Sequence, residues 1–249
     1  MTNIFFKFLI LVLLSGTVQA QVLSWGEPEK VGMSRERLSK LDEVVQQAIE
    51  KGEIPGAVVL VGRRGRLVYR QAFGNRILVP VSDQMTIDTI FDIASLTKVI
   101  ATATSIMILV EEGKLSLTDP VSNYLPHFGL YGKKSITLLQ LLTHYSGLRP
   151  DLDLDKPWEG YETAIKRAFL ERPIVTPGKQ FIYSDINYLV LAEIVNRVGG
   201  KHLHEFSSDR IFKPLGMVNT MFRPPASLNI KLLPVTLEME RCCTELYMI

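Results

Sequence analysis

The chain has 249 residues, of which 47% are hydrophobic and 22% are charged, and its formal net charge at pH 7 is +2. This hydrophobic share is enough for a substantial buried core in one good-sized domain or two small ones. Acidic and basic residues are interspersed and nearly balance, so the charge gives no basis for nucleic acid as a partner.

The first twenty residues have the pattern of a signal peptide. Lys7 supplies a positive charge, residues 8–14 form a short apolar run, and residues 18–20 resemble a cleavage site. The apolar run is too short to span a bilayer. We therefore expect residues 1–20 to be a signal peptide and residues 21–249 to form the exported domain, with no stable membrane span after cleavage. An uncleaved N-terminal anchor is the alternative.

A helix and a hairpin are predicted next along the chain. Ser34 suits the N-cap position before apolar residues at helical spacing over residues 38–49. Two β-like runs follow at residues 57–61 and 67–73, and the turn residues Arg64-Gly65 lie between them. This order predicts one helix packed on an antiparallel sheet.

The rest of the chain is mostly helical in pattern. Residues 99–110 are apolar nearly all round, which predicts a helix inside the protein that Gly113 ends. Further helices are predicted at 138–142 after the cap Thr137, at 164–170, and from the cap Ser184 to Val198, where Gly199-Gly200 end it. Because strands and helices are segregated, we expect an α+β fold: an antiparallel sheet flanked by helices plus a mostly helical region.

Ser95 and Lys98 are the strongest candidates for chemistry. They are three residues apart at the start of the predicted buried helix, so their side chains face the same way. A serine hydroxyl needs a neighbouring base, and a lysine amine serves as one when burial and nearby positive potential lower its pKa. The free N–H groups of a helix start also stabilise an oxyanion. Ser-x-x-Lys alone is a weak signal, and a helix cap with a solvated lysine is the alternative.

A second group of candidate residues precedes the last long helix. Pro177-Gly178 predicts a turn, and Tyr183 and Asp185 flank the helix start. Tyr183 there can pass a proton, and Asp185 can bind substrate or Lys98. The alternative is a core tyrosine and an aspartate that helps to cap the helix.

Several motifs together resemble the β-lactamase-related serine hydrolases, nearest to the class C β-lactamase, family VIII esterase and D-amino-acid peptidase branch, within a wider group of penicillin-binding-protein-like enzymes. The resemblance covers about residues 32–222. It rests on Ser95-Leu96-Thr97-Lys98, on residues 113–121 (GKLSLTDPV), on residues 141–148 (LLTHYSGL), on Pro177-Gly178 with Tyr183-Ser184-Asp185, and on Pro214-Leu215-Gly216-Met217.

This resemblance implies an acyl-enzyme mechanism on an ester, amide or β-lactam bond. Ser95 would be the nucleophile, Lys98 and Tyr183 would move the proton, and Asp185 would contact substrate. A small-molecule or peptidoglycan-like substrate, a periplasmic or secreted location and no metal or other cofactor are implied as well; the oligomeric state is not. His144 lies in a segment that shapes a turn in this family, so we assign it a structural role.

Two features depart from the family pattern. Asp185 stands where class C enzymes have Asn, and an ionised carboxylate donates no hydrogen bond. The third family motif, a Lys/His-Thr/Ser-Gly-like strand, is absent before Ile249. We therefore expect a domain without its C-terminal sheet strands, through a frameshift or premature stop.

The tail after Leu232 supports this expectation, because it departs from the family and contains the vicinal pair Cys242-Cys243, which closes no useful loop. A natural short form is the alternative origin. A non-catalytic remnant or binding module of the same fold is the alternative function.

Overall fold

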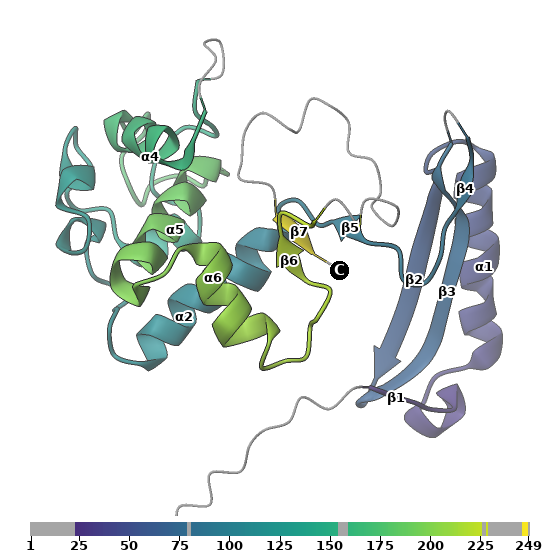
Figure 1. Cartoon of the computed structure of the whole chain (residues 1–249). Helices are drawn as coiled ribbons and strands as arrows, with labels where there is room; N and C mark the ends of the chain where they lie inside the picture. Colours follow the sequence, from purple (N-terminus) through teal and green to yellow (C-terminus); the bar gives the residue numbers. More distant parts are fainter. Residues whose placement is uncertain (1–22, 79–80, 154–158, 226–227, 229–245, 249) are drawn as a thin grey trace, which may run out of the picture.

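The computed structural model describes residues 23–78, 81–153, 159–225, 228 and 246–248 (Figure 1). The expected signal peptide and the Cys242-Cys243 pair lie outside the described residues. Within the described part, no helix is both long and apolar enough to cross a membrane. The chain forms a sheet with one covering helix and a separate helical region (Figure 1).

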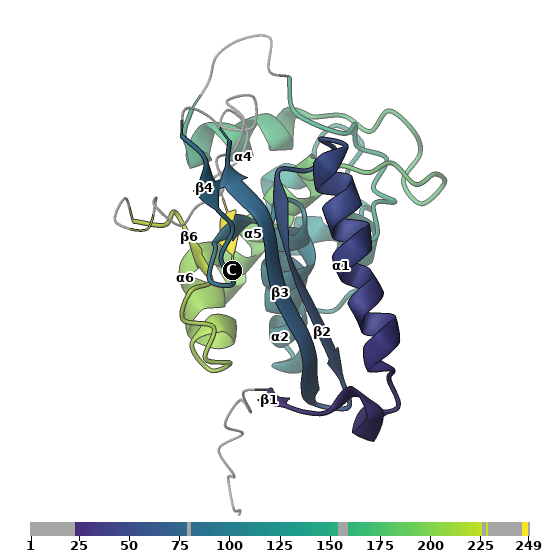
Figure 2. The ribbon, with the colours of Figure 1, turned by 90° about the vertical axis from the view of Figure 1, so that its right-hand side faces the viewer.

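The helix α1 (Arg35–Glu50) covers one face of the N-terminal sheet, and the helical region lies on the side of the opposite face (Figures 1 and 2). Ser34 caps α1 as expected, because its hydroxyl accepts the Arg37 N–H at 3.2 Å. Leu38 of α1 is buried against Val31 and Val68, and this apolar cluster holds the helix on the sheet.

The sheet has strands β1 (Ser24–Trp25), β2 (Gly56–Arg63), β3 (Arg66–Ile77) and β4 (Asp83–Gln84). The hairpin prediction is confirmed: β2 and β3 pair antiparallel, and Arg64 and Gly65 both have positive φ, as a two-residue hairpin turn requires. The sheet is not wholly antiparallel, because β1 pairs with β3 in the parallel direction.

The helical region contains seven helices of α or π type among the described residues. They are η2 (Lys98–Ala103), α2 (Thr104–Glu111), α3 (Leu138–Leu142), α4 (Tyr161–Leu170), α5 (Asp185–Gly199), α6 (Leu203–Ser207) and η5 (Ser208–Phe212). Short 3-10 turns are η1 (Pro28–Val31), η3 (Val121–Asn123) and η4 (Pro126–Gly129). Fully buried Ile106 and Leu109 of α2 pack in one core with Val190, Leu191 and Ile194 of α5.

The helix predicted at residues 99–110 differs from expectation in two respects. Its first part, η2, is a π-helix, and only its second part, α2, is α-helical. Val99 and Met107 are exposed, so the helix is buried on most of its circumference but not all round. Gly113 ends it as predicted, with φ of 68° and its N–H bonded to the Val110 carbonyl.

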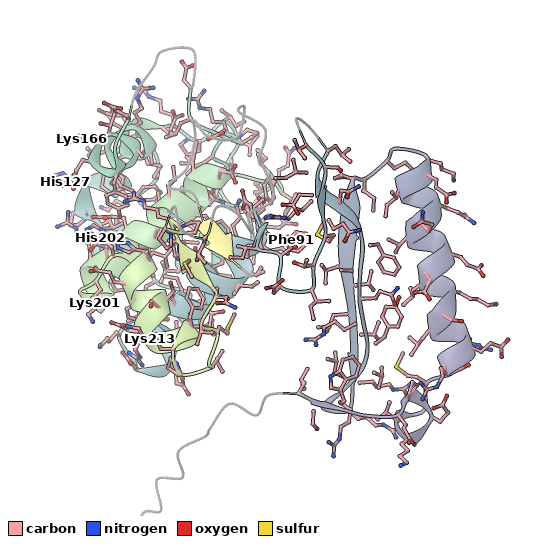
Figure 3. All side chains as sticks on the ribbon, turned by 45° about the vertical axis from the view of Figure 1, so that its right-hand side comes forward. Phe91, His127, Lys166, Lys201, His202 and Lys213 are labelled. Carbon is pink, nitrogen blue, oxygen red and sulfur yellow. The ribbon has the colours of Figure 1, made fainter. Side chains whose placement is uncertain are left out.

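A second, small sheet joins distant parts of the chain. Its strands are β5 (Phe91–Asp92), β6 (Met221–Phe222) and β7 (Leu246–Met248), and β7 pairs antiparallel with both of the others. Phe91 lies on the side of the helical region that faces the N-terminal sheet, whereas His127, Lys166 and Lys201 lie along the opposite side (Figure 3). The segment leading from β5 to Ser95 therefore runs between the two parts of the fold.

Candidate active site

Ser95 follows a strained turn that presents it to solvent. Ala94, directly before it, has φ of 42°, which is uncommon for a residue other than glycine. The Ala94 N–H donates to the Asp92 carboxylate at 2.7 Å, which supports this turn. Strained backbone of this kind is concentrated at functional sites. Ser95 is exposed, at the first turn of the helix that continues into η2.

Lys98 lies one helical turn after Ser95 and contacts it. Lys98 Nζ is 3.0 Å from Ser95 Oγ, as the spacing of three residues predicts. The side chain of Lys98 is only 14% exposed, and its Nζ also forms an ion pair with Asp185 Oδ1 at 2.6 Å. The Lys98 ammonium group thus links Ser95 and Asp185, which come from separate segments of the chain.

The pKa of Lys98 is opposite in direction to the sequence expectation. Burial acts to lower the pKa of Lys98 and is the largest single influence, but hydrogen bonding and charge from Asp185 and Tyr183 together outweigh it, so the pKa is raised. The prediction of a lowered pKa is therefore wrong, because the carboxylate partner could not be placed from local sequence. Lys98 is an ammonium group at neutral pH, with three N–H donors and no lone pair.

Tyr183 completes the cluster around Lys98. Lys98 Nζ lies 5.1 Å from the centre of the Tyr183 ring and 5.8 Å from that of Tyr188. The four predicted residues, Ser95, Lys98, Tyr183 and Asp185, therefore meet in one place and together form the Ser95 cluster. Tyr188 was missed in the sequence, although it is three residues from Asp185 and so on the same face of α5.

His144 packs behind the cluster. Its ring stacks on that of Tyr183 at 4.5 Å, and its Nδ1 accepts the Ser184 N–H at 3.0 Å. Burial and the positive charge of Lys98 lower the pKa of His144, so the imidazole is neutral and can accept this bond. These contacts fix the position of Tyr183.

Gly147 closes the turn that follows His144. Its φ is 78°, and a Cβ there would lie 2.2 Å from the Val175 carbonyl oxygen. Only glycine fits this position without strain.

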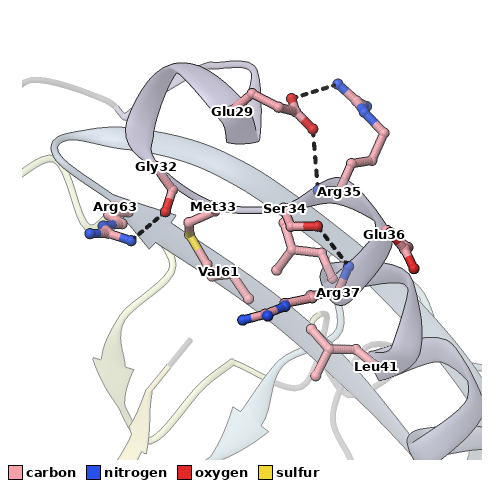
Figure 4. Close-up of a pocket in the computed structure, with 11 residues that line it drawn as sticks. Glu29, Gly32, Met33, Ser34, Arg35, Glu36, Arg37, Leu41, Val61 and Arg63 are labelled. Atoms are coloured by element: carbon pink, nitrogen blue, oxygen red, sulfur yellow. Dashed lines mark hydrogen bonds and ion pairs between the residues drawn. The ribbon is translucent and has the colours of Figure 1, made fainter.

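A surface hollow away from Ser95 is explained by hydrogen bonds and an ion pair at the start of α1. It has a volume of about 990 Å³ and lies beside the start of α1 (Figure 4). Its edges are held by the Ser34 cap, by Glu29 with Arg35, and by Arg63 donating to the Gly32 carbonyl. None of its lining residues belongs to the Ser95 cluster. Among the described residues, no group of three or more His, Cys, Asp or Glu side chains could hold a metal ion.

Known proteins resemble this chain over most of its length. A candidate D-alanyl-D-alanine carboxypeptidase of Escherichia coli strain K12 is 32% identical over an alignment 242 residues long, which covers 87% of this chain and 55% of that protein. A counterpart from Salmonella typhimurium strain LT2 is 29% identical over an alignment 226 residues long, which covers 83% of this chain and 52% of that protein. The chain thus spans about half the length of the curated relatives it matches.

Solved structures share the fold of this chain. A penicillin-binding protein homologue from Caulobacter crescentus has a TM-score of 0.72 at 25% identity, covering 82% of this chain and 55% of that one. A class C β-lactamase from Rhodobacter sphaeroides has a TM-score of 0.66 at 28% identity, covering 77% and 53%. The α+β fold predicted from the sequence is confirmed. The beta-lactamase family model matches residues 41–230, which include all four members of the Ser95 cluster, and the chain therefore belongs to the beta-lactamase family of hydrolases.

Proposed function

We propose that this chain is a serine hydrolase that forms an acyl-enzyme on Ser95. The observation that carries the proposal is the contact of one buried ammonium, Lys98 Nζ, with Ser95 Oγ at 3.0 Å and with Asp185 Oδ1 at 2.6 Å. Nucleophilic catalysis by serine needs a group against the hydroxyl that can take its proton, and Lys98 is in that position.

The reaction has two halves with balanced proton movements. Ser95 Oγ attacks a carbonyl carbon, its proton passes to neutral Lys98 or through Tyr183, and the same groups return a proton to the leaving alcohol or amine. Water then attacks the acyl group, gives up its proton along the same route, and releases the acid with Ser95 restored. The Ser95 N–H, at the helix start, donates to the developing oxyanion.

Lys98 holds a proton for most of the time because its pKa is raised. Its charge stabilises the Ser95 alkoxide as it forms, but it can accept the serine proton only in its neutral form. The raised pKa therefore limits the rate at neutral pH, and the reaction should accelerate as the pH rises.

The substrate is an ester, amide or β-lactam carbonyl compound. The names of the relatives make a peptide ending in D-alanyl-D-alanine a candidate, and a periplasmic or secreted location fits such a substrate. Asp185 narrows the choice chemically. Its Oδ1 is buried against Lys98, whereas the side chain as a whole is 33% exposed. A carboxylate accepts hydrogen bonds, so substrates that present an N–H or an amine beside the carbonyl are favoured.

The experiment is covalent labelling of the full chain with a fluorophosphonate, followed by mass spectrometry of the peptides. We expect one label, on Ser95, and its loss in Ser95→Ala. Ser39→Ala, which removes an exposed hydroxyl from α1, is the matched control and should label like the wild type. A label that persists in Ser95→Ala would identify another nucleophile. Intact folded protein that takes no label would favour a non-catalytic binding module.

A further inference from the structure

Ser184 attaches Tyr183 and Asp185 to a neighbouring loop. Its hydroxyl donates to the Arg149 carbonyl at 2.6 Å instead of capping α5, although Ser184 occupies the N-cap position. The next N–H, that of Asp185, donates to the Pro150 carbonyl at 2.7 Å. The main chain of residues 149–150 therefore sets where the two site residues lie.

Arg149 fixes this loop through its side chain. Its Nε and Nη2 atoms donate to the two carboxylate oxygens of Glu171, at 2.8 and 2.7 Å. Two parallel bonds hold the guanidinium plane as well as its distance, which a single ion pair does not. Arg149 touches none of the four cluster residues with its own side chain among the contacts that the structure describes.

Lys133 holds the main chain at Glu171, the residue that pairs with Arg149. Its side chain is fully buried, and Nζ donates to the main-chain carbonyls of Phe169, at 2.9 Å, and of Glu171. The rings of Phe128 and Tyr131 lie 5.2 and 5.3 Å from Nζ. Burial lowers the pKa of Lys133 to about 8. A neutral amine still has two N–H donors for the two carbonyls, so these two bonds form in both protonation states.

A buried lysine and a partly buried ion pair usually contribute little net stability to a fold, because proteins with apolar replacements of similar volume are often equally stable. We propose that Lys133, Glu171 and Arg149 form a positioning brace for the reaction. The brace holds the loop at residues 149–150, and through Ser184 it keeps Tyr183 and Asp185 in place beside Lys98. This inference rests on the proposed hydrolase function and adds Arg149 as a positioning residue outside the reacting groups.

The test compares the rate of fluorophosphonate labelling of Ser95 in the full chain with its thermal stability. We expect Arg149→Met to lower the limiting rate of labelling at high pH by about 10- to 100-fold, at a temperature where the protein is folded, because displacements near 1 Å can cost about 100-fold. Arg149→Lys retains the charge but not the fork, so it should recover only part of the rate. Arg210→Met removes a comparable ion pair, to Glu112 at 2.6 Å, and is the control expected to stay within about twofold of wild type.

Two further measurements separate positioning from a general loss of structure. Glu171→Gln keeps the main-chain carbonyl that Lys133 binds, and it should slow labelling as much as Arg149→Met does. The variant with both substitutions should label no more slowly than either single variant, because Arg149 and Glu171 act as a unit. The pH at which labelling rises should move downward in Arg149→Met, since Asp185 and Tyr183 would raise the Lys98 pKa less. A folded Arg149→Met that labels at the wild-type rate overturns the brace and leaves the hydrolase proposal intact. A folded wild type that takes no label would overturn both the brace and the hydrolase proposal.

Discussion

The Asp185→Asn variant tests the proton chemistry of the site most directly. Asparagine keeps the size of the side chain and the main-chain bond to Pro150, but it removes the negative charge 2.6 Å from Lys98 Nζ. An opposite charge at such distance typically moves a pKa by about 1–3 units, or about 1.4–4 kcal/mol. The low exposure of Lys98, 14%, favours the upper part of this range. Burial, the largest single influence on the pKa of Lys98, would then be opposed by Tyr183 alone, so this pKa should fall.

The expected result is a shift in the pH dependence of Ser95 acylation. If neutral Lys98 accepts the serine proton, the labelling rate should rise with pH, and this rising limb should lie about 1–3 pH units lower in Asp185→Asn than in wild type. At a fixed pH below this limb, labelling should accelerate by about tenfold or more. The assay is the second-order rate constant for fluorophosphonate labelling, measured by quenching and mass spectrometry.

Asp209→Asn is the matched control for this experiment. Asp209 is also 33% exposed and pairs with two lysines, Lys201 and Lys213, but it lies outside the Ser95 cluster. It should leave the pH profile unchanged. A rising limb that stays in place in Asp185→Asn, with a lower rate, would refute Lys98 as the base and would make Asp185 a participant in proton transfer.

Three other predictions follow from the same contacts. Lys98→Ala and Tyr183→Phe should each slow acylation by about 100- to 10,000-fold, the usual worth of a general base, and a Tyr183→Phe variant that labels normally would make Tyr183 a packing residue. The pKa of Lys133 is about 8 in the folded state and 10.5 is its ordinary value, so the unfolded chain binds more protons than the folded protein between pH 8 and pH 10.5. The free energy of unfolding should therefore rise with pH over this range, by at most about 3 kcal/mol. Urea titrations should show this rise for wild type but not for Lys133→Met. Gly147→Ala should lower the free energy of unfolding by more than about 2 kcal/mol, while Gly113→Ala, also at positive φ but with open space around it, should cost about 1 kcal/mol; equal losses would show that strain alone, without the contact to Val175, decides the effect.

Local patterns predicted the parts of the fold that local interactions form. The Ser34 cap, the Arg64-Gly65 turn and the Thr137 cap, which makes a full capping box with Gln140, each depend on residues within four positions of one another. The Ser95 and Lys98 contact was predictable for the same reason. The π-helix at η2 was not, because its hydrogen-bond spacing leaves no signature in an apolar sequence.

The properties that depend on distant partners could not be predicted in the same way. The direction of the Lys98 pKa shift changes sign with the placement of Asp185, which is far along the chain, and helical spacing says nothing about that distance. The parallel pairing of β1 and the contribution of β7 to a sheet with β5 are likewise set by tertiary structure. Residue types alone identified the candidates, but not their protonation.

Ser184 shows how a local rule can fail for a reason connected with function. A serine at an N-cap normally bonds its own helix, worth about 1 kcal/mol. Here its hydroxyl donates to the Arg149 carbonyl, so the start of α5 is tied to a loop outside the helix. A self-capped helix would hold Tyr183 and Asp185 relative to α5 alone. The observed bond instead holds them relative to the loop at residues 149–150, whose position depends on Glu171 and, through it, on buried Lys133. Changes at these distant residues should therefore alter chemistry at Ser95 before they unfold the protein.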